Sequence, residues 1–172
     1  MTEVLVLIDA PDGKVTKPSL ELLTLARRIG EPSAVVFGDA DTAVLGEYGA
    51  EKIYTYDAAD YADYLVAPKA EALAQLVADK SPAAVLVGAS TEGKEISARV
   101  ALKTSSGWIS DAVDIAVDGD TVTTTQSVFA GNFTVQSQVV KGAPIITVKP
   151  NSTTPEAAAG AAAVQAVTAE IS

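Results

Sequence analysis

The sequence predicts an α/β fold, a three-layer sandwich in which helices cover both faces of a mostly parallel sheet. Strand-like apolar runs alternate with helix-like segments through the first part of the 172 residues, and the connections are too long for hairpins. Ala and Val dominate while aromatic residues make up 5%, which suits β-branched strands covered by Ala-rich helices. After residue 107 the apolar pattern changes to period two, so antiparallel strands are expected in the C-terminal part.

The first strand is expected at residues 3–9, where EVLVLID is continuously apolar, as in a parallel strand buried on both faces. A helix should follow, with Thr16 as its N-cap, Pro18 in its first turn and Gly30 as its stop signal. The next segments indicate a strand, a short helix and a strand at 33–38, 41–50 and 51–57.

A longer helix is indicated by apolar residues at helical spacing, and it should end near Lys80; these residues are Val66, Ala70, Leu73 and Val77. The fourth strand, AAVLVGA at 83–89, follows Pro82. Ile96 and Val100 lie four residues apart and predict the buried stripe of one more helix.

The period-two region, residues 114–139, predicts antiparallel strands, with Asp118-Gly119 at a tight hairpin turn. APIITVKP at 143–150 supplies a last strand. We expect one domain at 1–150, followed by an Ala-rich linker at 151–172 toward a domain missing from this chain.

Composition excludes several classes of function. The chain has no Cys and no His, so thiolate chemistry and the usual zinc ligands are excluded, and we expect no metal site and no catalytic residue. A net charge of −10 disfavours nucleic acid as a partner. The N-terminal apolar run, 4–8, is too short for a signal or a membrane span, so we predict a cytoplasmic protein without membrane insertion.

Gly88, Gly93 and Lys94 match the phosphate-binding pattern G-x-x-x-x-G-K-[ST] until its last position. There Glu95 replaces the Ser or Thr that would bind Mg²⁺. Glu92 and Glu95 both fall near the first turn of the following helix, where carboxylates would repel a phosphate. This stretch is therefore expected to be a strand-to-helix turn that does not hydrolyse nucleotides.

In that turn, Ser90 or Thr91 is the expected N-cap, and Gly93 should permit close packing of helix against sheet. Ligands of open parallel sheets nevertheless bind at the carboxyl ends of strands. The candidate residues of a vestigial nucleotide pocket are therefore Asp9, Gly88, Ser90, Thr91 and Gly93.

Asp111 and Asp114 are candidates for a pair of carboxylates in acid–base chemistry. On a strand, however, side chains three residues apart point to opposite faces, so the two cannot converge without a bulge. We expect Asp111 to organise a turn instead.

Two surface features are candidates for interfaces. Trp108 is either a core residue or an interface anchor. Val128, Phe129 and Phe133 alternate out of step with a single buried face, so we expect an exposed patch there.

The ordered segments resemble the N-terminal domain of electron transfer flavoprotein alpha subunits from one end of the chain to the other. The combination of segments is specific to this family, whereas no single segment is. The segments are EVLVLID, PSLELLTLARRIG, YGAEKIYTYD, LVGASTEGKEISARVALKTSSGWISDAVDI, FAGNFTVQSQVV and APIITVKP. The chain departs from the family at Gln126 and Ser127, where many alpha subunits have Arg-Pro before the aromatic residue, which is Phe129 here.

The resemblance implies a Rossmann-like sheet of the adenine nucleotide alpha hydrolase-like type and a heterodimer with a beta subunit. It implies an electron carrier rather than an enzyme. In fatty acid β-oxidation such a carrier passes electrons from acyl-CoA and other dehydrogenases to a quinone oxidoreductase and so to the respiratory chain. FAD is held mainly by a C-terminal domain that this chain lacks, and AMP by the beta subunit. Residues 88–95 correspond in place to the loop that holds AMP phosphate in the beta subunit, and in alpha subunits that pocket is generally empty.

Two alternatives remain open from the sequence. One is a free-standing adenine-nucleotide-binding module of the universal-stress type, with Asp9, Gly88 and Ser90 around adenosine. The other is an interaction domain of a different assembly.

Overall fold

The computed structural model describes residues 2–61 and 64–171. Within them, short 3-10 turns occupy Pro11–Gly13 and Ala58–Asp60. The strands and helices are β1 (Glu3–Leu7), α1 (Lys17–Ala26), β2 (Glu31–Phe37), α2 (Thr42–Glu47), β3 (Lys52–Tyr56), α3 (Ala67–Lys80), β4 (Ala84–Gly88), α4 (Thr91–Lys103), β5 (Trp108–Asp118), β6 (Thr121–Val128), β7 (Phe133–Gln138), β8 (Ile145–Val148) and β9 (Ala163–Ala166).

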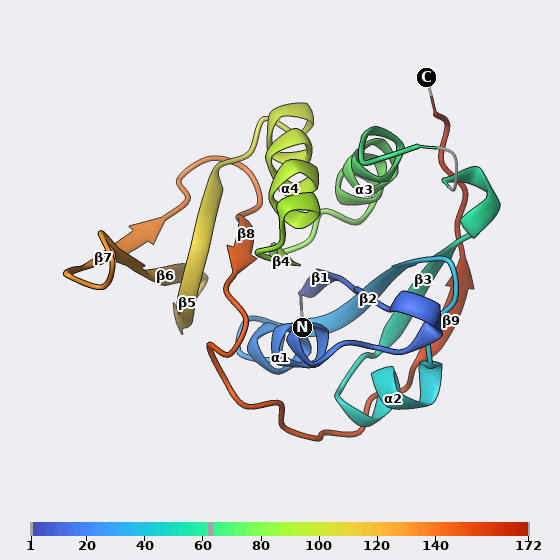
Figure 1. Cartoon of the computed structure of the whole chain (residues 1–172), viewed down its shortest axis with the longest axis horizontal. Coiled ribbons are helices and arrows are strands. Elements are labelled where there is room, and N and C mark those ends of the chain that lie inside the picture. The colour runs from blue at the N-terminus through green and yellow to red at the C-terminus, as the bar shows by residue number, and fades with distance from the viewer. Residues whose placement is uncertain (1, 62–63, 172) are drawn as a thin grey trace.

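The strands that the structure describes form one sheet in the order β7-β6-β5-β8-β4-β1-β2-β3-β9. From β5 through β8 to β9 all neighbours are parallel, whereas β5, β6 and β7 pair antiparallel. Helices α1 and α2 lie on one face, and α3 and α4 lie on the other (Figure 1). The predicted three-layer fold, mostly parallel with antiparallel strands in the C-terminal part, is confirmed.

The core lies in two clusters, one on each face of the sheet. Strand β1 contributes to both: Val4 and Val6 pack with α1, whereas Leu5 packs with α3 and α4, and none of the three is exposed. This is the pattern of a parallel strand covered on both faces, because successive side chains point to opposite sides. Each residue of this strand therefore removes apolar surface from water, at about 25 cal/mol per Å².

The predicted stripes of α3 and α4 are confirmed, and α1 has a buried stripe as well. Leu22 and Ala26 of α1 join the first cluster, and Leu73, Val77 and Ile96 of α3 and α4 join the second. Among the described residues, no helix combines the length and the apolar character needed to cross a membrane.

Several boundaries differ from the expectation, among them the end of α1, which falls at Ala26 instead of next to Gly30. The strand β1 ends at Leu7, because the N–H of Asp9 turns to the Ser19 hydroxyl at 2.9 Å instead of a neighbouring strand. The hairpin turn falls one residue later than predicted: Asp118 still pairs with Thr121, and Gly119 takes a positive φ of 58° in the turn. Glycine adopts this left-handed conformation without the Cβ clash of other residues.

The Ala-rich segment that begins at Asn151 is not a free tether. Its described part crosses beneath α1 and α2 and then adds β9 beside β3 (Figure 1). The N–H of Asn151 donates to Glu21 Oε2 at 2.8 Å, and the N–H of Glu156 donates to Thr24 Oγ1 at 3.0 Å. Residues 151–166 are therefore held on the body of the fold by backbone contacts, whereas their role as a linker stays a prediction.

Two buried tyrosines make the stability of this fold sensitive to alkaline pH. Burial raises the pKa of Tyr56 to about 12, and burial together with a hydrogen bond to Glu3 raises the pKa of Tyr54 still further. Both pKa values exceed the ordinary value of about 10, so the contribution of the neutral phenols is complete below pH 10 and is lost as the pH rises through the folded-state values.

We therefore expect urea midpoints to fall between about pH 10 and pH 12, and to fall less in a Tyr54→Phe/Tyr56→Phe variant. An equal loss in the variant and the wild-type protein would assign the alkaline sensitivity to other groups.

Candidate functional site

A cavity of about 410 Å³ opens at the carboxyl ends of β1 and β4. Of the predicted pocket residues, Asp9, Gly88, Ser90 and Gly93 line it, whereas Thr91 is exposed and does not. The wall also contains residues from α1, β2 and α3, including Ser19, Phe37 and Lys69. Sequence reasoning missed these three because no motif marks them.

The N-terminus of α4 is capped by Ser90 rather than Thr91. The Ser90 hydroxyl accepts a hydrogen bond from the N–H of Gly93 at 3.0 Å, so one of the free amides of the first turn is already satisfied. A Cβ at Gly93 would lie only 2.0 Å from the carbonyl oxygen of Gly88. Gly93 is therefore required by the close packing of α4 on the end of β4.

Gly88 has no such structural need. It lies at the end of a strand without a positive φ, and nothing lies within 4 Å of the position that its Cβ would occupy. Glycine is a poor strand residue, because it loses more conformational freedom on folding than any other residue. The physical consequence of glycine here is that the cavity stays open at this point.

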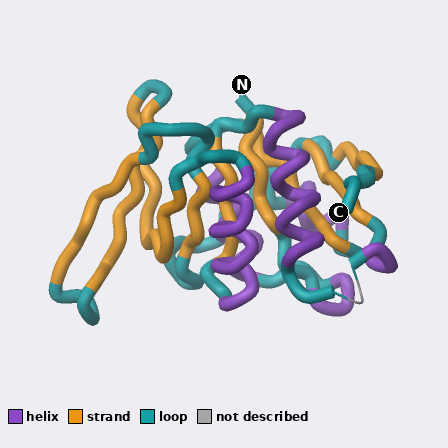
Figure 2. Tube along the Cα trace, turned by 90° about the horizontal axis from the view of Figure 1, so that it is seen from above, coloured by secondary structure: helices purple, strands orange, loops and turns teal. Residues whose placement is uncertain are grey.

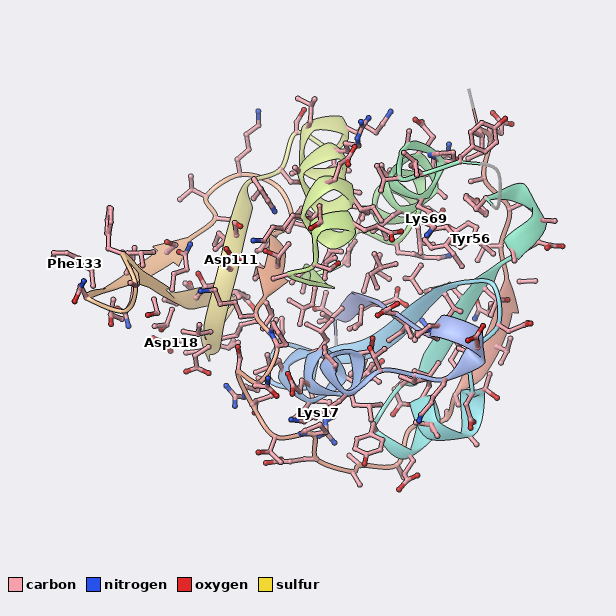
Figure 3. The ribbon with its side chains drawn as sticks, in the orientation of Figure 1. Lys17, Tyr56, Lys69, Asp111, Asp118 and Phe133 are labelled. Atoms are coloured by element: carbon pink, nitrogen blue, oxygen red, sulfur yellow. The ribbon has the colours of Figure 1, made fainter. Side chains whose placement is uncertain are left out.

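The two lysines of this region are each paired with a carboxylate. Lys69 Nζ lies 2.6 Å from Glu92 Oε1, and both residues line the cavity. Lys94 does not line it and instead contacts Asp111 at 2.9 Å. Figure 3 shows Lys69 and Asp111 on opposite sides of α4. The lysine of the phosphate-binding pattern is therefore directed away from the position where a phosphate would lie.

Glu95 does not lie where it could repel a phosphate in the cavity. Its carboxylate contacts Arg99 one turn along α4 at 2.8 Å, both side chains are about half exposed, and Glu95 is not part of the cavity wall. Only Glu92 brings negative charge to the cavity at this helix end. The prediction that both glutamates would repel a phosphate is therefore wrong for Glu95, and for Glu92 it stays a prediction.

The two candidate acid–base carboxylates do not converge. Asp111, at a bulge of β5 with a φ of 60°, contacts Lys94 on α4, whereas Asp114 contacts Arg28 just after α1 at 2.8 Å. Because α1 and α4 cover opposite faces, the bulge does not bring the carboxylates together. Among the residues that the structure describes, no group of three or more Asp, Glu, His or Cys could hold a metal ion.

The sequence profile of the electron transfer flavoprotein domain matches residues 4–172. The chain belongs to this family. Electron transfer flavoprotein subunit alpha of Mycobacterium tuberculosis is 42% identical over 166 residues, which cover 94% of this chain and 51% of that protein. The subunit of the same name from Mycobacterium leprae is 41% identical over 167 residues, with 94% and 51% covered.

A more distant relative, the lactate dehydrogenase (NAD(+),ferredoxin) subunit LctC of Acetobacterium woodii, is 27% identical over 142 residues, covering 77% of this chain and 34% of that protein. The chain spans about half the length of the electron transfer flavoprotein alpha subunits that it matches. The resemblance seen in the sequence is confirmed at the level of the family.

The family name implies a flavin, and the cavity does not fit FAD. A diphosphate carries negative charge that a binding site usually offsets with cationic side chains. Here Lys69 is neutralised by Glu92, Lys94 is neutralised by Asp111, and the Ser90 hydroxyl is used by the helix itself. We therefore assign no redox step to the described residues of this electron transfer flavoprotein domain.

Replacing Glu92 with Gln should raise the affinity of the cavity for AMP by about threefold to tenfold, or roughly 1 kcal/mol. The change removes a like charge and also frees Lys69, which Glu92 now holds at 2.6 Å. Titration of the protein with AMP, followed by NMR, measures the effect. Glu95→Gln is the matched control and should leave the affinity unchanged, because Glu95 lies outside the cavity. Equal affinities of the two variants would show that the Glu92 carboxylate does not exclude phosphate.

Proposed function

We propose that this chain is the scaffold and subunit-binding half of an electron transfer flavoprotein alpha subunit. In the complete protein, electrons pass from acyl-CoA and other dehydrogenases through FAD to a quinone oxidoreductase and the respiratory chain. The observation that carries the proposal is the match over residues 4–172, together with alpha-subunit relatives about twice as long as this chain.

In this proposal the chain is not catalytic and acts in the cytoplasm. FAD is bound mainly by a C-terminal domain to which the segment at 151–172 leads, and AMP is bound by the partner beta subunit. The paired charges of the cavity support this division, since neither lysine is available to a phosphate group.

The proposed partner can be tested directly. The chain and an electron transfer flavoprotein beta subunit from the same organism are mixed and analysed by size-exclusion chromatography with light scattering. We expect a complex with one copy of each chain. If the two chains elute separately at concentrations well above the dissociation constants of ordinary subunit interfaces, the proposal fails. The chain is then better explained as an interaction domain of a different assembly.

The cavity itself favours one second candidate, a free-standing adenine-nucleotide-binding module. The observation in its favour is the open space at Gly88, beside Asp9 and Ser90 at the ends of two parallel strands. Calorimetry with AMP and ATP separates the two. Binding with a Kd below about 10 μM, a binding free energy of roughly −7 kcal/mol, would favour the module if Gly88→Val abolishes it. Weaker binding favours the scaffold.

A further inference from the structure

The hairpin formed by β6 and β7, residues 121–138 and called the arm below, lies outside the three-layer body. It projects from the edge of the sheet beyond β5, with no helix over either face (Figures 1 and 2). Every residue from 131 to 136 is exposed, although successive side chains of β7 point to opposite faces. Both faces of β7 are thus open.

The arm also lacks the devices that usually protect an edge strand. No charged residue occurs between Asp120 and Lys141, in a chain of which 20% is charged. The described pairing of β6 with β7 runs from Thr123–Gln138 to Val128–Phe133 without a register shift, and no proline interrupts it. Natural edge strands normally carry charges, prolines or bulges, because an exposed flat edge invites pairing with another chain. A surface without these features is typical of the core of an interface, where charged residues are depleted.

The tip of the arm presents two aromatic rings to solvent. Phe129 is 77% exposed and Phe133 is 62% exposed, and the rings pack edge to face with centroids 5.7 Å apart. Phe129 and Ala130 both have positive φ, at 52° and 55°. Such a conformation costs on the order of 1–3 kcal/mol in a non-glycine residue and persists where the surroundings or the function require it. The backbone of the turn is thus held in a strained form that exposes the large apolar side chain of Phe129 to solvent.

We propose that the arm is the surface on which the unlike partner subunit docks, with Phe129 and Phe133 as anchors and an uncharged, apolar surface of the partner facing them. This inference rests on the proposed function. A second copy of this chain is the less suitable occupant, because two bodies of net charge −10 would be brought together across an arm that carries no compensating positive charge.

The test is a double variant, Phe129→Lys/Phe133→Lys, mixed with the beta subunit and measured by calorimetry. We expect the affinity to fall at least about thirtyfold, because buried aromatic anchors usually dominate interface energies. Leu65→Lys is the matched control: Leu65 is also an exposed apolar residue, at 87%, and lies just before α3, so the affinity should not change. Phe129→Ser/Phe133→Ser, which adds no charge, should weaken binding in the same direction, and equal thermal midpoints establish that all variants are folded.

The outcomes separate the two proposals. If the wild-type chain binds the beta subunit and both double variants bind as tightly, the arm is not the docking surface, while the proposed function stands. If the wild-type chain does not bind at all, both proposals are rejected. If the isolated chain forms a dimer that the double variant dissociates, the arm joins two copies and the inference is overturned.

Discussion

Replacing Gly93 with alanine should lower the free energy of unfolding by about 2–3 kcal/mol. In an ordinary helix interior the same change would stabilise the protein by about 1 kcal/mol, because alanine is the better helix former. Here the new Cβ would lie 2.0 Å from the carbonyl oxygen of Gly88, and that atom belongs to the backbone of a buried strand, not to a side chain that could rotate away. Helix α4 would have to move off the end of β4. This steric clash outweighs the better helix propensity of alanine, so the net change is destabilising.

Gly88→Ala is the control, and urea unfolding of both variants is the measurement. Nothing lies within 4 Å of the Cβ position at Gly88, so its free energy of unfolding should change by less than about 1 kcal/mol, in the stabilising direction. Equal stability of Gly93→Ala and the wild-type protein would mean that the contact between α4 and β4 is looser than described.

Replacing Glu21 with alanine should lower the free energy of unfolding by about 2 kcal/mol. Glu21 is only 2% exposed, its Oε2 accepts the N–H of Asn151 at 2.8 Å, and Lys17 Nζ lies 3.4 Å from its Oε1. Without the carboxylate, the N–H of Asn151 loses its acceptor in a partly buried position. The first anchor of the C-terminal segment on α1 is then lost, so local protection should fall as well as global stability.

Urea unfolding and amide hydrogen exchange along residues 151–166 measure the two effects. Glu95→Ala is the control, since the exposed pair with Arg99 is worth about 0.5 kcal/mol or less. Unchanged exchange at Ala158, Gly160 and Ala162 in Glu21→Ala would show that the segment is held by its later contacts alone, through the N–H groups of these three residues.

The body of the fold follows from local patterns, and the C-terminal segment does not. Continuous apolar runs and helical stripes predict β1 or α4, because burial of those side chains is what stabilises them. Strand β9 is different: all four of its residues are exposed, and it is held through backbone pairing with β3. The stretch before β9 is held on α1, where Glu21 and Thr24 lie more than a hundred residues away in sequence, so no local pattern predicts these contacts.

The site divides in the same way. The cap at Ser90 and the close packing at Gly93 are properties of one turn, and the sequence predicts both. Lys69 reaches the cavity from α3, and only the tertiary fold brings it to Glu92. The prediction that Glu95 would repel a phosphate is wrong because Arg99, four residues along the same helix, pairs with it on the outer surface.

We propose that the redox cofactor of the complete electron transfer flavoprotein is bound by residues outside those described here. The most direct measurement is flavin retention: the purified chain is incubated with excess FAD and desalted, and flavin absorbance is compared with protein concentration. The account predicts a colourless protein. One equivalent of FAD, retained as tightly as in a complete carrier, would contradict it.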